Sequence, residues 1–254
     1  MIPIPENLTP RDKMVMAGLF LAKFDLDGVR KLGFASFAEA FNVIGYALRG
    51  RPASIKNYRD EFDPLFPNRR KGWHKRQTRD YCMKVFESYK HLDLNTFAAL
   101  LRSFFGYDAD ILSEIGDERA SERKESVFAL RLATGLAAEH YFESVQPTIP
   151  EFRSCFVENL TRLGCGYDYR LTGGGFEDFV ALEVKGLTGK NGSVSFTPKE
   201  HAVAADLGER FVLFVVKNFS EKPFHEIYRN PIAGGLHFKK RKRITVHISW
   251  VTKV

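Results

Sequence analysis

Residues 166–186, GYDYRLTGGGFEDFVALEVKG, contain the pattern that decides the fold of the second half of the chain. The TGGG turn joins two strand-like runs, GYDYRL and FVALEVKG, and predicts a β-hairpin. Residues two apart on a strand point to the same face, so Glu183 lies beside Lys185. The hairpin brings Asp168 to the same end of the sheet. One interpretation is an exposed edge strand with an ion pair, and the other is a metal site.

The second interpretation has a chemical basis. Two neighbouring carboxylates repel each other, and a cation between them relieves the repulsion. Mg²⁺ prefers oxygen ligands and keeps waters and substrate phosphates in its remaining positions. We therefore predict that Asp168 and Glu183 bind Mg²⁺, for which Mn²⁺ is expected to substitute. Lys185 would orient or help deprotonate an attacking water, or stabilise charge on a phosphate. Metal-assisted hydrolysis of a phosphodiester requires this arrangement.

The segments around the hairpin predict an α/β core. Helices are predicted at 126–145 and 198–208, and further strands at 153–160, 210–219 and 244–254. The run RFVLFVV at 210–216 is apolar enough for a strand that is buried on both faces. This pattern defines a domain over residues 126–254.

The first half of the chain predicts a mainly helical domain over residues 1–106. Thr9, Ser36 and Thr78 each stand where a helix N-cap is expected, before runs with helical periodicity. Residues 107–125 are highly charged and poor in large apolar side chains. We interpret this segment as a linker or an exposed helical connector and place the domain boundary there.

The charge balance favours a polyanionic partner. The chain of 254 residues has 38 Lys and Arg against 31 Asp and Glu, and a net charge of +7. Residues 49–79 carry ten Lys or Arg against three acids. We predict that this segment binds DNA, mainly through the phosphate backbone. A solvated basic face is the alternative. The predicted contact residues are Lys56, Asn57, Arg59, Arg69, Arg70, Lys71, Trp73, Lys75 and Arg76.

A second basic cluster, HFKKRKR at 237–243, is open to three interpretations. It is a phosphate contact, a solvated loop or a nuclear signal. Its composition alone does not separate them.

Several motifs in the second half resemble one known domain. They are GLAAEHYF (135–142), VENLTRLGCGYDYRL (157–171), ALEVKG (181–186), FTPKEHAVAADLGERFVLFVV (196–216) and NPIAG (230–234). Together they resemble the domain at the C-terminus of the plant protein NO VEIN, a member of the PD-(D/E)xK nuclease superfamily. The resemblance covers residues 126–232.

The resemblance implies a restriction-endonuclease-like fold, in which a mixed sheet is flanked by helices. Asp168, Glu183 and Lys185 match its acid and acid-x-lysine positions. Glu139 matches a glutamate on the first core helix that supports the metal site, directly or through water. Glu158 is a rival for that role and ranks lower, because it falls in a strand-like run.

These observations predict a Mg²⁺-dependent endonuclease acting on double-stranded DNA, in restriction or antiviral defence. The alternative is a non-catalytic DNA-binding or modified-base-recognition module that keeps the nuclease fold. RNA as the substrate stays open. Cutting both strands needs two active sites or two visits, and a homodimer would supply the former.

The sequence also favours a cytoplasmic protein without membrane contact. The N-terminus has no apolar signal region, and no apolar run reaches about 18 residues. Cys82, Cys155 and Cys165 show no metal-ligand spacing and indicate free thiols in a reducing compartment.

Overall fold

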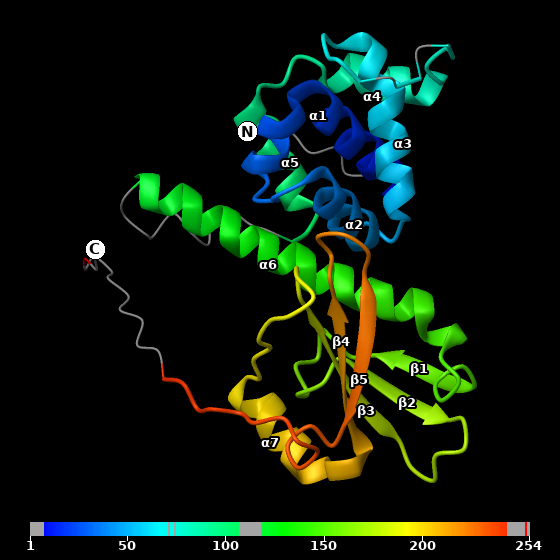
Figure 1. Cartoon of the computed structure of the whole chain (residues 1–254), viewed down its shortest axis with the longest axis vertical. Helices are drawn as coiled ribbons and strands as arrows, with labels where there is room; N and C mark the ends of the chain where they lie inside the picture. The colour runs from blue at the N-terminus through cyan, green and yellow to red at the C-terminus, as the bar shows by residue number, and fades with distance from the viewer. Residues whose placement is uncertain (1–7, 71, 74, 107–117, 243–251, 253–254) are drawn as a thin grey trace.

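A bundle of helices and a five-stranded sheet make up the two halves of the chain (Figure 1). The computed structural model describes residues 8–70, 72–73, 75–106, 118–242 and 252. The helices of the first half are α1 (Pro10–Lys31), α2 (Phe37–Ala47), α3 (Pro52–Phe62), α4 (Asp80–Tyr89) and α5 (Leu94–Ser103).

Two of the three predicted helix caps are confirmed. The Thr9 side chain accepts a hydrogen bond from the backbone N–H of Asp12, and Ser36 accepts one from Glu39. The prediction for Thr78 is wrong by one residue, because Arg79 occupies the N-cap of α4 and uses no side-chain hydrogen bond there. The Arg79 guanidinium is instead paired with Glu61 of α3.

The second half is a mixed α/β domain, as predicted. Among the described residues, its sheet has the order β1-β2-β3-β4-β5, and only the β3–β4 pair is parallel. The predicted hairpin is confirmed as β2–β3, and Gly173, Gly174 and Gly175 all take positive φ in its turn. The strands are β1 (Cys155–Asn159), β2 (Tyr169–Gly173), β3 (Val180–Gly186), β4 (Phe211–Lys217) and β5 (Phe224–Arg229).

The prediction missed β5, which pairs antiparallel with β4. Its sequence, FHEIYR, mixes charged and apolar residues, and most of its side chains are half-buried. The strand predicted at 244–254 falls outside the described residues except for Thr252. The apolar strand β4 is buried from Phe211 to Val216, as its sequence predicts.

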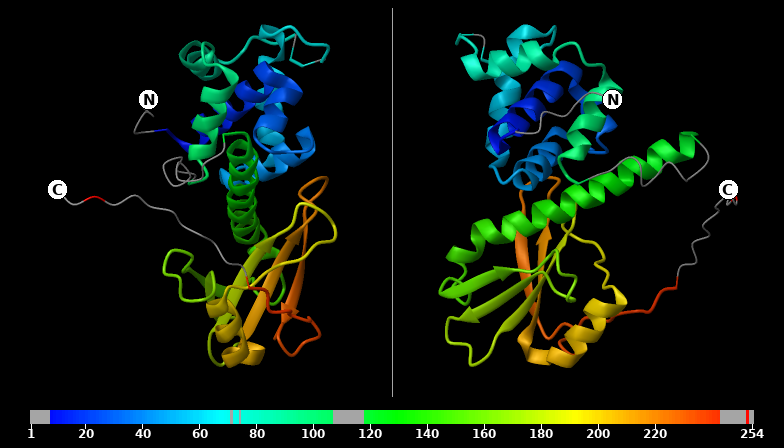
Figure 2. Two further views of the ribbon diagram at one scale, coloured as in Figure 1. Left: turned by 90° about the vertical axis from the view of Figure 1, so that its left-hand side faces the viewer. Right: turned by 180° about the vertical axis from the view of Figure 1, so that it is seen from behind.

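Helices cover both faces of the sheet. The long helix α6 (Glu118–Val145) crosses one face, and the short helix α7 (Pro198–Leu207) lies on the other (Figures 1 and 2). On the α6 side, the Phe142 ring packs 4.9 Å from Tyr169 and 5.0 Å from Phe214, measured between centroids. Within the described residues, short 3₁₀ turns lie at Asp63–Leu65, Gln146–Thr148 and Gly208–Arg210.

The helical half packs on the outer side of α6 through α2 (Figure 2). The buried Asn42 side chain donates hydrogen bonds to the carbonyls of Phe219, at 2.8 Å, and Glu221, at 3.0 Å. His140 Nδ1 lies 3.0 Å from the Tyr46 carbonyl oxygen. The two halves therefore share a hydrogen-bonded interface and one continuous apolar core.

Residues 118–125 of the predicted connector form the first part of α6, while 107–117 lie outside the described residues. None of the helices in the described part of the chain has the length and apolar character that a membrane crossing requires. All three cysteines are free thiols, as predicted.

Candidate active site

The site begins where β2 and β3 separate. Their ladder covers only three residue pairs, from Tyr169–Leu182 to Leu171–Val180, whereas β3 continues to Gly186 beside β4. Within the described part of the chain, the edge of β3 beyond Leu182 therefore has no strand partner on the β2 side. The Asp168 carboxylate takes that place, because its Oδ2 accepts a hydrogen bond of 2.8 Å from the backbone N–H of Val184. This bond fixes Asp168 beside Glu183.

Glu183 and Lys185 lie on an interior strand and not on an exposed edge. The Glu183 residue is 3% exposed, and its Oε1 lies 2.5 Å from Lys185 Nζ. The same ammonium lies 3.0 Å from Glu200 Oε2, at the start of α7. Lys185 is therefore held between two carboxylates, so the predicted ion pair exists, but in a buried place.

The resemblance implies auxiliary polar residues at Lys199 and Glu200, where the next helix opens, but Glu200 was not among the predicted catalytic or metal-binding residues. Its side chain also closes the capping box of α7 with Thr197, which fixes the carboxylate toward Lys185. The sequence TPKE at 197–200 has the pattern of a capping box. That pattern predicts where a helix starts, but it does not predict that the glutamate reaches a site.

Three acidic side chains of the site have raised pKa values. Burial and the nearby Asp168 raise the pKa of Glu183 to about 8, despite the opposing effect of Lys185. Burial also raises the pKa of Asp168. On α6, burial and the neighbouring Asp168 and Glu143 raise the pKa of Glu139 to about 7. Burial is the largest cause of all three shifts, and repulsion from neighbouring carboxylates adds to it.

Lys185 keeps its proton in this setting. Burial alone lowers the pKa of its ammonium, but the charges and hydrogen bonds of Glu183 and Glu200 outweigh burial and raise it. A cationic Lys185 can orient a water or stabilise a developing negative charge.

The donor set fits a hard divalent cation, because Asp168 and Glu183 present carboxylate oxygens. Within the described residues, no group of three or more His, Cys, Asp or Glu side chains could hold a metal ion. A metal at Asp168 and Glu183 would therefore depend on water or substrate for its other ligands. That requirement matches Mg²⁺, which retains several waters.

Glu143 links the site to the helical half, and sequence reasoning missed it. Its carboxylate accepts hydrogen bonds from the Tyr169 hydroxyl, at 3.0 Å, and the Asn159 amide, at 3.2 Å, and it is paired with Arg49. Glu143 stands four residues after Glu139, and this spacing indicates that both side chains lie on the same face of α6. The rival acid Glu158 is exposed on β1.

A cavity of about 230 Å³ lies beside this link, between the end of α2 and α6. It does not include Asp168 or Glu183. Its lining residues are Tyr46, Arg49, Gly50, His140, Glu143 and Ser144.

Residues 137–229 match the family model of Protein NO VEIN, C-terminal. The match runs from α6 to the end of β5, so it contains Glu139, Asp168, Glu183 and Lys185. It agrees with the domain resemblance predicted from the motifs. No curated protein sequence and no solved structure matches the chain.

Helix α3 carries Lys56, Asn57 and Arg59 of the predicted DNA-contact residues. It lies outside the NO VEIN-like region, on the side of α6 away from the sheet (Figure 1). Lys56 and Asn57 are exposed on α3. Arg59 is not free, because its guanidinium lies 2.9 Å from Asp60 Oδ1 and stacks over the rings of Phe37 and Phe41.

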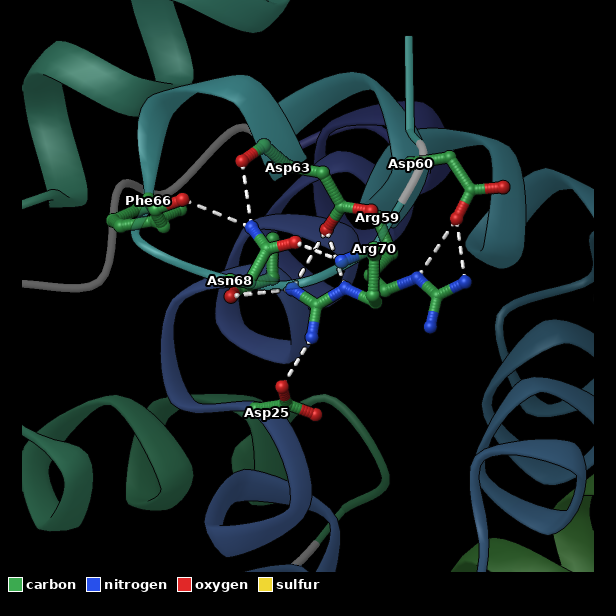
Figure 3. Close-up of polar contacts among 8 residues, drawn as sticks. Asp25, Arg59, Asp60, Asp63, Phe66, Asn68 and Arg70 are labelled. Atoms are coloured by element: carbon green, nitrogen blue, oxygen red, sulfur yellow. Dashed lines mark hydrogen bonds and ion pairs between the residues drawn. The ribbon is translucent and has the colours of Figure 1, made fainter. Parts of the chain in front are cut away.

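Arg70 is also held inside the helical half (Figure 3). Its Nε donates a hydrogen bond of 2.8 Å to the buried Asp63, and its Nη1 pairs with Asp25. Asp25 interrupts α1 with a φ of 50°. A buried carboxylate such as Asp63 requires a partner of this kind, so the structure gives Arg70 an internal role.

The segment after α3, which we call the basic loop (residues 67–79), is hydrogen-bonded through its described residues to α3 and to the turn that follows α3. Asn68 donates hydrogen bonds to two carbonyls, those of Asp63 and Phe66 (Figure 3). The backbone N–H of Trp73 bonds to Asp60, and a Cβ on Gly72 would lie only 2.4 Å from the Asp60 carbonyl oxygen. A residue with a side chain at position 72 would therefore collide with the backbone of α3.

Three of the predicted contact residues on this loop are exposed cations, namely Arg69, Lys75 and Arg76, and a fourth exposed cation, Arg79, is paired with Glu61. The Arg76 guanidinium lies over the half-buried Trp73 ring, 5.3 Å from its centroid. Lys71 lies outside the described residues. The exposed part of the predicted contact set therefore consists of these three cations together with Lys56 and Asn57.

Proposed function

We propose that this chain is a Mg²⁺-dependent endonuclease that hydrolyses phosphodiester bonds in double-stranded DNA. The observation that carries the proposal is the placement of Asp168 and Glu183 beside the cation of Lys185, at the point where β2 leaves β3. The match of residues 137–229 to the NO VEIN C-terminal family supports it, because the match includes these side chains. Placement in the PD-(D/E)xK superfamily belongs to the same proposal.

Asp168 and Glu183 would hold the metal. When bound, Mg²⁺ supplies positive charge for a phosphate oxygen and favours ionisation of a coordinated water. Lys185, which Glu183 and Glu200 position, would orient the attacking water or stabilise charge on the phosphate. Glu139 has a pKa near neutrality, so its carboxyl can hold a proton or a water at the edge of the cluster.

The net charge of +7 supports a polyanionic substrate. Arg69, Lys75 and Arg76 of the basic loop, together with Lys56, would contact phosphates. The hydrogen bonds from Asn68 and from the Trp73 N–H hold the described part of this loop at the end of α3. Arg59 and Arg70 would support this surface from inside.

Plasmid cleavage tests the proposal. Purified protein should cut plasmid DNA with Mg²⁺ or Mn²⁺ and not with EDTA, and Asp168→Ala, Glu183→Ala and Lys185→Ala should each abolish cutting. Glu158→Ala is the matched control, because it removes an exposed acid of the same domain. Parallel reactions with methylated and unmethylated plasmid test the proposed setting in restriction. Binding without any cutting would overturn the proposed activity and favour the non-catalytic alternative.

A further inference from the structure

The chain that follows β5 returns to the active-site side of the sheet. Figures 1 and 2 show this segment passing along α7. The Phe238 ring packs against Phe196, with 4.7 Å between centroids, and meets the His201 ring edge-on at 5.8 Å. Aromatic rings at these distances attract each other beyond the effect of the apolar area that they bury. Phe238 therefore anchors the segment at α7.

The anchor is close to the candidate active site. The ring of Phe196 lies 5.8 Å from Lys185 Nζ on one side and 5.9 Å from the Phe211 ring of β4 on another. Phe238 is thus one aromatic ring away from the lysine that Glu183 and Glu200 hold. Nothing in the sequence spacing brings residues 238 and 185 together.

Four cations follow the anchor directly. We call Lys239, Lys240, Arg241 and Lys242 the basic tail; all four are exposed. None of them forms an ion pair with any residue in the described ranges. Four extended residues span about 13 Å, an axial length over which one strand of DNA carries about four phosphates. The basic tail therefore offers uncompensated charge directly after the packed Phe238.

We infer that the basic tail binds the sugar–phosphate backbone of a nucleic acid beside the active site, and that Phe238 sets its position. This inference rests on the proposed function, because it names a part of the substrate surface for that site. A solvated loop or a transport signal gives no reason for an anchor at this place, whereas packing of Phe238 on Phe196, next to Lys185, keeps the four cations close to the candidate active site. The contact is independent of base sequence.

DNA binding in EDTA tests the charges while metal-dependent cutting is off. Changing all four tail cations to Gln should weaken binding to duplexes of unrelated sequence alike. It should also reduce the slope of log K against log salt by about 0.9 for each lost contact, and we expect at least two. The control changes Lys84, Arg131, Arg162 and Lys222 to Gln, which removes the same charge from exposed, scattered positions.

Phe238→Ala tests the anchor, because it keeps every charge. We expect it to weaken binding about threefold to tenfold, and Phe238→Tyr to restore most of the loss. Equal affinity and salt slope in the tail variant and its control would overturn the inference, as would unchanged binding by Phe238→Ala. These results decide the inference even if the wild-type protein never cuts DNA, since cutting is measured separately.

Discussion

Replacing Glu183 by Gln should stabilise the metal-free protein at neutral pH. Gln has nearly the shape of a protonated Glu and still accepts a hydrogen bond from Lys185. The wild-type carboxyl, by contrast, is buried beside Asp168, which raises its pKa from 4.5 to about 8. The unfolded chain loses this proton near pH 4.5 and the folded protein only near pH 8.

The sign and size of the effect follow from this difference. Because the folded pKa is the higher one, the stability that Glu183 contributes is complete below about pH 4.5 and is lost as pH rises through 8. Each pH unit in that window removes up to about 1.4 kcal/mol. The free energy of unfolding of Glu183→Gln should exceed that of wild type by less than about 1 kcal/mol at pH 5 and by about 2–4 kcal/mol at pH 7.5. The upper end of this range applies if solvent does not screen the charge.

Urea unfolding in EDTA at pH 5 and pH 7.5 measures this advantage. The control is Glu158→Gln on the exposed β1 strand, whose difference from wild type should be the same at both pH values. Adding Mg²⁺ should then stabilise wild type, by about 2.7 kcal/mol at one hundred times its dissociation constant. Glu183→Gln should gain much less. If the free energy of unfolding changes equally between pH 5 and pH 7.5 in wild type and in Glu183→Gln, the reasoning is refuted.

Three further predictions concern the helical half and its interface. Arg70→Gln should lower the free energy of unfolding by about 2–4 kcal/mol, because it leaves Asp63 buried without its cation, while the neighbouring Arg69→Gln should change it by less than about 0.5. Asn42→Ala should cost about 1–3 kcal/mol by thermal or urea unfolding, since two carbonyls at the interface lose their donor. Burial lowers the pKa of His140. The stability that the neutral imidazole contributes is therefore present above about pH 6.5 and is lost as pH falls. Between pH 6.5 and 5.5, the melting temperature of wild type should drop more than that of His140→Gln.

The parts of the fold that could be predicted are those with a local pattern. The TGGG turn and the alternation in FVALEVKG specify a hairpin, and the run FVLFVV specifies a strand buried on both faces. β5 has no such pattern, because it is an edge strand with half-exposed side chains. Its position depends on pairing with β4 and on the stacking of His225 on Phe214, with 4.7 Å between the rings. Both are contacts with residues distant in the sequence.

The basic residues show even more clearly that contacts between distant parts of the chain cannot be predicted from a local pattern. Arg69 and Arg70 are adjacent and identical in type, yet Arg69 is exposed and Arg70 is paired with Asp25 and Asp63. A count of basic residues treats them alike. Only the fold, which brings Asp25 of α1 next to the basic loop, separates a cation that is available to a partner from one that holds the loop in place.

The central residues of the candidate site can be predicted from the sequence, whereas the residues around them cannot. Asp168, Glu183 and Lys185 are joined by one hairpin, so strand periodicity places them together. Glu200 and Glu143 reach the site from helices on opposite faces of the sheet, and only the packing of those helices brings them close. Arg49 then connects the helical half to Glu143, whose carboxylate also bonds to Tyr169, the residue after Asp168. The helical half is therefore linked through hydrogen bonds to the strand that carries the candidate metal ligand, and a change at Arg49 can alter the site without touching it.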